Sequence, residues 1–85
     1  MPEREHSDAD LLILGRAIRR MREQMSMSAD ELADATGMAP RRLAALETGR
    51  LDPTYDLLLV VVEGLGVRLS ALMALAEQLE QSNEP

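Results

Sequence analysis

Hydrophobic positions in this chain recur mainly at intervals of three and four residues, the spacing of an amphipathic α-helix. The clearest case runs from Asp8 to about Met25, where one apolar stripe contains Leu11, Leu14, Ile18, Met21 and Met25. A second stripe predicts a helix from Leu69 to Gln81, with Leu72, Leu75, Ala76 and Leu79 on one face. The pattern therefore predicts a long helix towards each end of the chain.

Residues 28–49, between these helices, have the pattern of two short helices joined by a glycine turn. Ser28 and Glu31 stand in the S-x-x-E order of a capping box, which starts a helix. Gly37 ends that helix, because glycine adopts the left-handed cap conformation without a side-chain clash. Pro40 suits the first position of the next helix, which Gly49 closes.

The most apolar segment is LLLVVV at residues 57–62. Its periodicity alone also allows a β-strand. Thr54 as a helix N-cap and Asp56 in the first turn favour a helix that runs to about Gly64. A helix that is apolar on every side must be buried on every side. In so small a domain, we expect one of its side chains to meet a partner subunit: Leu57, Leu59 or Val60.

The segment 28–49 resembles the helix-turn-helix of phage-repressor and Cro-like proteins, also called the XRE family. The resemblance rests on the order of Ser28, Ala29, Asp30, Glu31, Leu32, Ala33, Gly37, Met38, Leu43, Leu46, Glu47, Gly49 and Pro53. It extends upstream through LGRAIRRMRE and downstream through LLLVVVEGLGVRLSALM, so it covers about residues 11–75. It implies an all-α, compact five-helix lambda-repressor-like domain over residues 9–81. We expect residues 1–8 to be a flexible acidic arm and residues 82–85 a disordered tail.

Composition narrows the functions that the chain can have. Eighty-five residues make one small domain, and the absence of cysteine leaves no disulfide framework or thiolate metal site. His6 stands alone, and no nucleophile lies in a pattern with a base, so we predict no metal site, no cofactor and no catalytic residue. Tyr55, the single aromatic residue, provides no stacking platform for single-stranded nucleic acid. The longest apolar run is too short to span a membrane. The family resemblance implies a bacterial or phage protein of the cytoplasm.

The net charge of −6 is unevenly distributed. Residues 16–50 hold seven arginines and five acids, a balance of +2. Residues 1–15 hold four acids and one arginine (−3), and residues 51–85 hold six acids and one arginine (−5). Positive charge is therefore concentrated around the predicted helix-turn-helix, whereas the acidic ends should weaken non-specific DNA binding.

The second helix of this motif carries the candidate DNA-reading residues. The resemblance places Pro40, Arg41 and Ala45 at positions that face bases in the major groove. Arg41 has the donors to bind guanine O6 and N7, while Pro40 and Ala45 offer only apolar contact, as with a thymine methyl group. The alternative is that Arg41 is a solvated side chain on a polar face. The candidate contacts to the DNA backbone are Arg42, Ser28, Arg19 and Arg50.

Two further positions matter to this interpretation. The resemblance implies a structural salt bridge between Arg22 and Glu47, which would fix the DNA-reading helix to the first helix. At Ala29 the family usually has a glutamine that contacts a phosphate, and alanine has no side-chain donor for that contact. Arg20 stands at helical spacing from Glu23, so a solvated ion pair is the alternative to a DNA contact on that face.

We therefore predict a sequence-specific double-stranded DNA-binding regulator, working as a dimeric repressor on a palindromic operator. Its partners would be double-stranded DNA and a second copy, bound through the fourth and fifth predicted helices. The alternative is a protein-interaction module of antitoxin or co-regulator type, with the same fold and weak DNA binding. An enzyme is disfavoured because the sequence holds no catalytic constellation.

Overall fold

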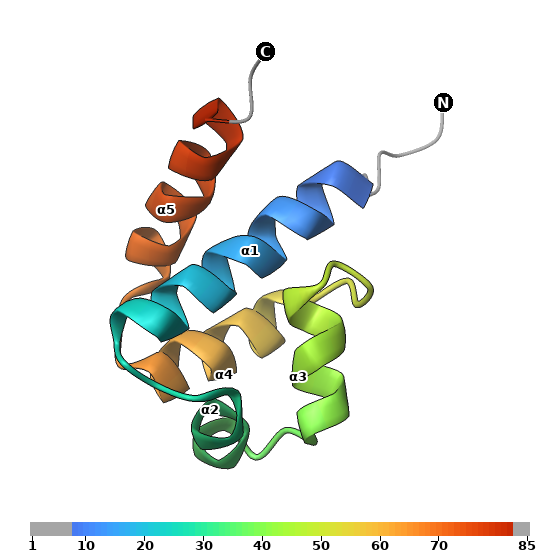
Figure 1. The fold of residues 1–85 in the computed structure, drawn as a ribbon, viewed down its shortest axis with the longest axis vertical. Coiled ribbons are helices and arrows are strands. Elements are labelled where there is room, and N and C mark those ends of the chain that lie inside the picture. The colour runs from blue at the N-terminus through green and yellow to red at the C-terminus, as the bar shows by residue number, and fades with distance from the viewer. Residues whose placement is uncertain (1–7, 83–85) are drawn as a thin grey trace.

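The computed structural model describes residues 8–82, and five α-helices account for most of them (Figure 1). They are α1 (Asp8–Gln24), α2 (Ala29–Thr36), α3 (Pro40–Glu47), α4 (Tyr55–Leu65) and α5 (Leu69–Ser82). The predicted all-α fold with a central helix-turn-helix, formed by α2 and α3, is confirmed. The expected arm and tail lie outside the described residues, apart from Asp8, which begins α1, and Ser82, which ends α5.

Two helix ends differ from the sequence-based expectation. α1 ends at Gln24, and Ser26 adopts a φ of 56°. Because the chain turns there, Met25 leaves the apolar stripe and is 47% exposed. α4 runs past Gly64 to Leu65, and Gly66, with a φ of 77°, is its C-cap.

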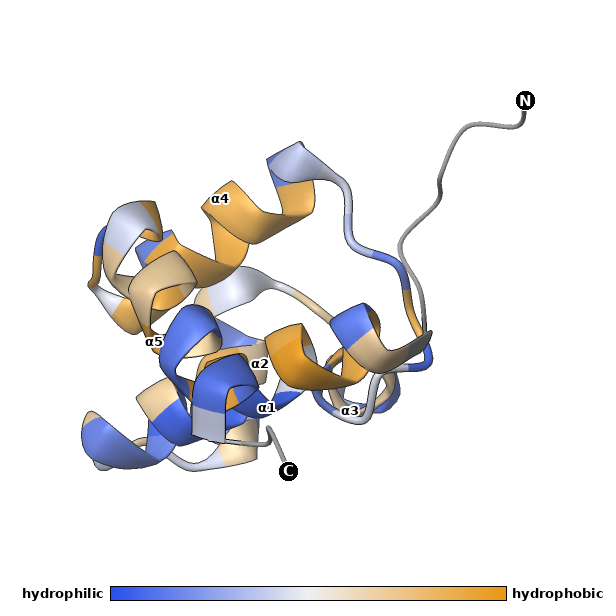
Figure 2. Cartoon of the chain, turned by 90° about the horizontal axis from the view of Figure 1, so that it is seen from above, coloured by the Kyte–Doolittle hydropathy of each residue, from blue (hydrophilic) through white to orange (hydrophobic). Residues whose placement is uncertain are grey.

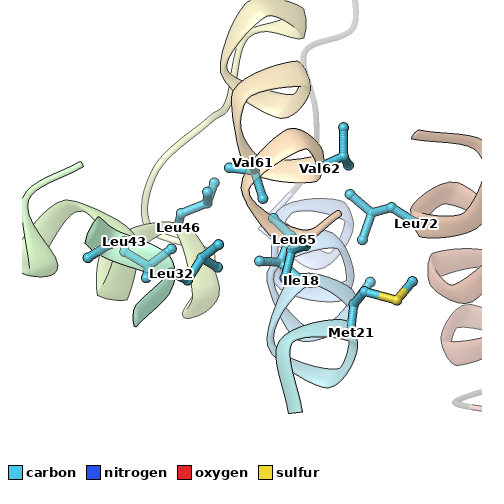
Figure 3. Packing of buried hydrophobic residues seen from close by; sticks show 11 residues of the cluster. Ile18, Met21, Leu32, Leu43, Leu46, Val61, Val62, Leu65 and Leu72 are labelled. Carbon is cyan, nitrogen blue, oxygen red and sulfur yellow. The ribbon is translucent and has the colours of Figure 1, made fainter. Parts of the chain in front are cut away.

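A single core joins the five helices. α1 packs on α5 and α3, and α2 packs on α3 and α4. The fully buried side chains come from all five helices and include Ile18, Leu32, Leu43, Leu46, Val61 and Leu72 (Figure 3). At roughly 1.5–3 kcal/mol for each large apolar side chain, this burial is the main stabilising contribution to the fold.

Two glycines allow α3 and its C-terminal turn to lie directly against α1. A Cβ on Gly15 would be 2.5 Å from the carbonyl oxygen of Leu46. A Cβ on Gly49, whose φ is 79°, would be 2.9 Å from the Cα of Leu12. Both contacts are with backbone, which no side-chain rotation can relieve. The position of α3 therefore depends on the absence of side chains at these two sites.

α4 is the most hydrophobic helix of the domain (Figure 2). Its N-cap Thr54 accepts a hydrogen bond from the Leu57 amide at 3.1 Å, as the start signal predicts. Val61 is fully buried, whereas Leu59 and Val60 are each 39% exposed. An apolar strip of α4 thus remains uncovered by the described residues. No single helix among them is both long and apolar enough to cross a bilayer, although α4 and α5, bent by 99°, satisfy the length and composition requirement together.

Candidate nucleic-acid interface

The N-terminus of α2 is closed by the capping box. The Glu31 amide donates to Ser28 Oγ at 3.0 Å, and the Ser28 amide donates to Glu31 Oε1 at 2.7 Å. Asp30 and Glu31 in the first turn also complement the helix dipole. The Ser28 amide is consequently occupied, but its exposed hydroxyl keeps a proton to donate. Ala29, the first residue of α2, is exposed beside it.

The N-terminus of α3 has none of these stabilising features. Its N-cap is Ala39, which forms no side-chain cap, and its first turn contains no acid. Arg41 and Arg42 stand there instead, both exposed, and neither forms an ion pair with any residue of 8–82. A positive charge at a helix N-terminus opposes the helix dipole and costs about 0.3–1 kcal/mol. Helix stability therefore does not account for these two arginines.

The remaining exposed side chains of α3 and its C-cap are small and mostly apolar. Pro40 is exposed at its start, and Ala45 is half-buried. Neither Ala44 nor Thr48 was predicted to belong to this surface, yet both are exposed, and with Arg41 they follow the i, i+3, i+7 spacing of one helix face. That spacing is visible in the sequence and could have identified them. The outer face of α3 thus presents one long cationic side chain beside small ones.

A bidentate ion pair fixes α3 to α1. Arg22 Nε lies 2.8 Å from Glu47 Oε2, and Arg22 Nη2 lies 3.0 Å from Glu47 Oε1. The two side chains are only 11% and 8% exposed. The hydrogen bonds to Glu47 raise the pKa of Arg22 above its usual value, outweighing the effect of burial. A raised base pKa adds stability that is fully present below the pKa of the unfolded state and is lost only as the pH rises through the pKa of the folded state, so Arg22 remains charged at any physiological pH.

Arg22 also fixes the turn that leads from α1 into α2. Its Nη1 donates to the carbonyl oxygen of Met27 at 3.0 Å, immediately before the capping serine. Ser26, in the same turn, has the only positive φ of a non-glycine residue in the described part of the chain. One guanidinium group therefore joins α1, the entry to α2 and the end of α3. We expect this arrangement to keep the two helices of the motif in fixed relative positions.

The other candidate backbone-contact residues are arranged differently. Glu23 pairs with Arg19, at 3.2 Å between Oε2 and Nε, rather than with Arg20 as the spacing suggested. Arg50 is exposed in the turn after α3. Arg42 and Arg50 therefore lie at the two ends of α3, while Arg19 lies on α1. Within residues 8–82, no group of three or more His, Cys, Asp or Glu side chains is placed to hold a metal ion.

Comparison with known proteins agrees with this geometry. A family model described as helix-turn-helix, HTH_3, matches residues 18–72. The crystal structure of the clp gene regulator ClgR from C. glutamicum is 30% identical to the chain, with a TM-score of 0.78 over 81% of this chain and 90% of that one. No curated protein matches the chain significantly.

Two other solved structures have the same fold. An HTH_3 family transcriptional regulator from Vibrio cholerae is 26% identical, with a TM-score of 0.76 over 93% of this chain and 45% of that one. The restriction-modification controller protein C.AhdI from Aeromonas hydrophila is 23% identical, with a TM-score of 0.72 over 75% of this chain and 97% of that one. At that identity, the likeness to C.AhdI concerns the fold alone.

Proposed function

Because the chain belongs to the HTH_3 helix-turn-helix family, we propose that it is a DNA-binding transcriptional regulator that acts as a dimeric repressor on a two-fold symmetric operator. The observation that carries the proposal is the pair of exposed arginines at the uncapped N-terminus of α3. Recognition helices present their N-terminal residues to base edges in the major groove. Arginines that oppose the helix dipole are explained by a role in binding an anionic partner.

Arg41 is the proposed base-reading residue. Its guanidinium group would bind O6 and N7 of guanine in a bidentate pair, worth about 1–3 kcal/mol of discrimination against other bases. Pro40 and Ala45, together with the exposed Ala44, offer only apolar contact, suited to thymine methyl groups. Because Arg41 is the single long donor among the proposed base-facing residues, part of the sequence preference would come from DNA shape.

Phosphate contacts would hold the motif on the duplex. Arg42 and Arg50 lie at the two ends of α3, and the Ser28 hydroxyl lies at the start of α2. Arg19 is retained in this group, although its pairing with Glu23 would have to break. Each phosphate neutralised by a cationic side chain contributes about 0.9 to the slope of log K against log salt. Two or three such contacts in each copy of the proposed dimer predict a slope of magnitude about 4–5, which is a steep salt dependence.

A second copy is the proposed partner of α4 and α5. Tyr55, Leu59 and Val60 are exposed on α4, and Met73 is exposed on α5. Covering this apolar surface would add stability that an 85-residue domain has difficulty obtaining alone. In such a dimer, the two copies of α3 would enter successive major grooves about 34 Å apart.

The α4 surface tests the dimer directly. Leu59→Asp should shift the protein from dimer to monomer in analytical ultracentrifugation at micromolar concentration. Leu12→Asp is the matched control, because Leu12 is similarly exposed (43% against 39% for Leu59) but lies on α1. A wild-type protein that sediments as a monomer would rule out the dimer.

One observation favours a second candidate function, a protein-interaction module. Ala29 lacks a side-chain donor, so α2 provides less to a phosphate than the family pattern does. The exposed apolar strip of α4 could bind a different protein instead of a second copy. In that case the helix-turn-helix would serve as a scaffold.

Selection from a random duplex DNA library separates the two candidates. Wild type, Arg41→Ala and Arg68→Ala would be selected in parallel at moderate salt. Arg68 is an exposed arginine just before α5, so its variant controls for loss of one positive charge. We expect a two-fold symmetric motif for wild type and Arg68→Ala, and a weakened or relaxed motif for Arg41→Ala. No enrichment for wild type would exclude sequence-specific binding and favour the interaction module.

A further inference from the structure

A second concentration of positive charge lies away from the helix-turn-helix. A groove of about 340 Å³ runs between α1 and α5. Its lining consists of Arg16, Arg19, Arg20, Glu23, Leu79 and Ser82. Three guanidinium groups thus share one small groove on a protein whose net charge is −6.

Ion pairs among residues 8–82 balance only part of the charge in this groove. Glu23, its single carboxylate, pairs with Arg19. Arg16 and Arg20 form no ion pair with any residue of 8–82. They also stand four residues apart on α1, where like charges destabilise a helix. An anion bound between them would remove this repulsion.

Most of the groove lies apart from the proposed DNA surface. α3 and α5 lie on different sides of α1 (Figure 1). Arg22, which bonds to Glu47 of α3, marks the side of α1 that faces α3. At 100° per residue, Arg16 and Arg20 lie about 120° and 160° around the helix from Arg22. A duplex held by α3 would therefore leave Arg16 and Arg20 free, whereas Arg19, about 60° from Arg22, is shared between the groove and the proposed phosphate contacts.

The lining indicates the class of ligand. Arginine forks match phosphate oxygens in bidentate hydrogen bonds, and three of them favour several phosphate groups over one. Leu79 is the single large apolar side chain in the lining, so a protein partner would find no cluster of anchoring pockets. The lining includes no aromatic side chain on which a nucleobase could stack. We propose that this groove binds a compact oligophosphate, recognised by its phosphates alone.

Thermal unfolding with sodium triphosphate, at ionic strength matched by sodium chloride, tests the site. Tm should rise by about 5 °C or more at a triphosphate concentration tenfold above Kd. The double variant Arg16→Gln/Arg20→Gln should lose most of this rise. The control Arg41→Gln/Arg42→Gln loses the same charge from α3 and should keep it. In wild type, the side-chain Nε–H signals of Arg16 and Arg20 should shift in NMR spectra on titration.

Three results would overturn the assignment. The first is no rise in Tm for wild type, and the second is an equal rise in the Arg16→Gln/Arg20→Gln variant. The third is a clearly larger rise with adenosine triphosphate than with triphosphate, because recognition by phosphates alone predicts equal effects. Far-UV circular dichroism before each melt would verify that both double variants remain folded.

Discussion

Gly15→Ala tests how closely α3 lies against α1. The added Cβ would be 2.5 Å from the carbonyl oxygen of Leu46 and 2.6 Å from that of Glu47. Ordinary contacts between carbon and a carbonyl oxygen begin at about 3.3 Å, so the end of α3 would have to move by about 0.8 Å. Both oxygens belong to backbone, so the whole turn would have to move.

Two effects of this substitution have opposite signs. In a helix interior, replacing glycine by alanine stabilises a protein by about 1 kcal/mol through conformational propensity. Overpacking that forces a backbone shift costs about 1–3 kcal/mol, and the backbone contacts place this site at the upper end of that range. We therefore expect a net loss of about 1–2 kcal/mol, or a fall in Tm of about 4–16 °C.

Urea unfolding followed by circular dichroism would measure this loss. Ala74→Gly, at an exposed position of α5, calibrates the propensity difference in the same protein. If Gly15→Ala instead stabilises the domain by as much as Ala74→Gly destabilises it, α3 does not approach α1 as closely as described. The packing argument for the position of α3 would then be refuted.

Four further substitutions test the motif. Arg22→Met leaves the Glu47 carboxylate buried without its partner and should lower the free energy of unfolding in urea by about 3 kcal/mol. A loss below about 1 kcal/mol, typical of a surface pair, would contradict the proposed role of this ion pair in fixing α3 to α1. Ser26→Gly removes a non-glycine residue from a φ of 56° and should stabilise the fold by about 0.5–1 kcal/mol in the same assay, whereas destabilisation would argue against that turn geometry. Ala29→Gln adds a donor beside the proposed phosphate site and should raise affinity for the selected duplex about 2–10-fold in fluorescence anisotropy; unchanged affinity would place the start of α2 away from the backbone. Arg41→Glu should abolish duplex binding while stabilising the fold by about 0.5–1 kcal/mol, and a loss of stability would count against a dipole cost at that position.

The local signals in the sequence were sufficient for most of the fold. Ser28 and Glu31 form the capping box that their spacing predicts, and Gly37 adopts the left-handed cap conformation with a φ of 76°. These features depend on residues within one turn of one another, so their spacing along the chain determines their contacts. Thr54 starts α4 for the same reason and decides between helix and strand for LLLVVV.

Contacts between helices were harder to predict. The apolar stripe extended α1 to Met25, but α1 ends at Gln24 and the left-handed Ser26 turns the chain directly after Met25. Serine gives no signal in the sequence for that conformation. Both Arg19 and Arg20 are spaced to reach Glu23, and the choice between them depends on side-chain conformation on an exposed helix face. The crowding of Gly15 depends on the position of α3, which is distant in sequence.

α2 and α3 have eight residues each but obtain their stability differently. α2 has a capping box and an acidic first turn, so much of its stability is local. α3 lacks both and carries two arginines in its first turn, so its stability must come mainly from tertiary contacts: the burial of Leu43 and Leu46, the close approach at Gly15 and the salt bridge of Glu47. All of these contacts lie on the inner side of α3 or at its C-terminal end. The N-terminal turn is therefore free to carry residues that bind a partner rather than stabilise the helix. If Arg41 trades stability for DNA binding in this way, Arg41→Glu should make the fold more stable and abolish DNA binding.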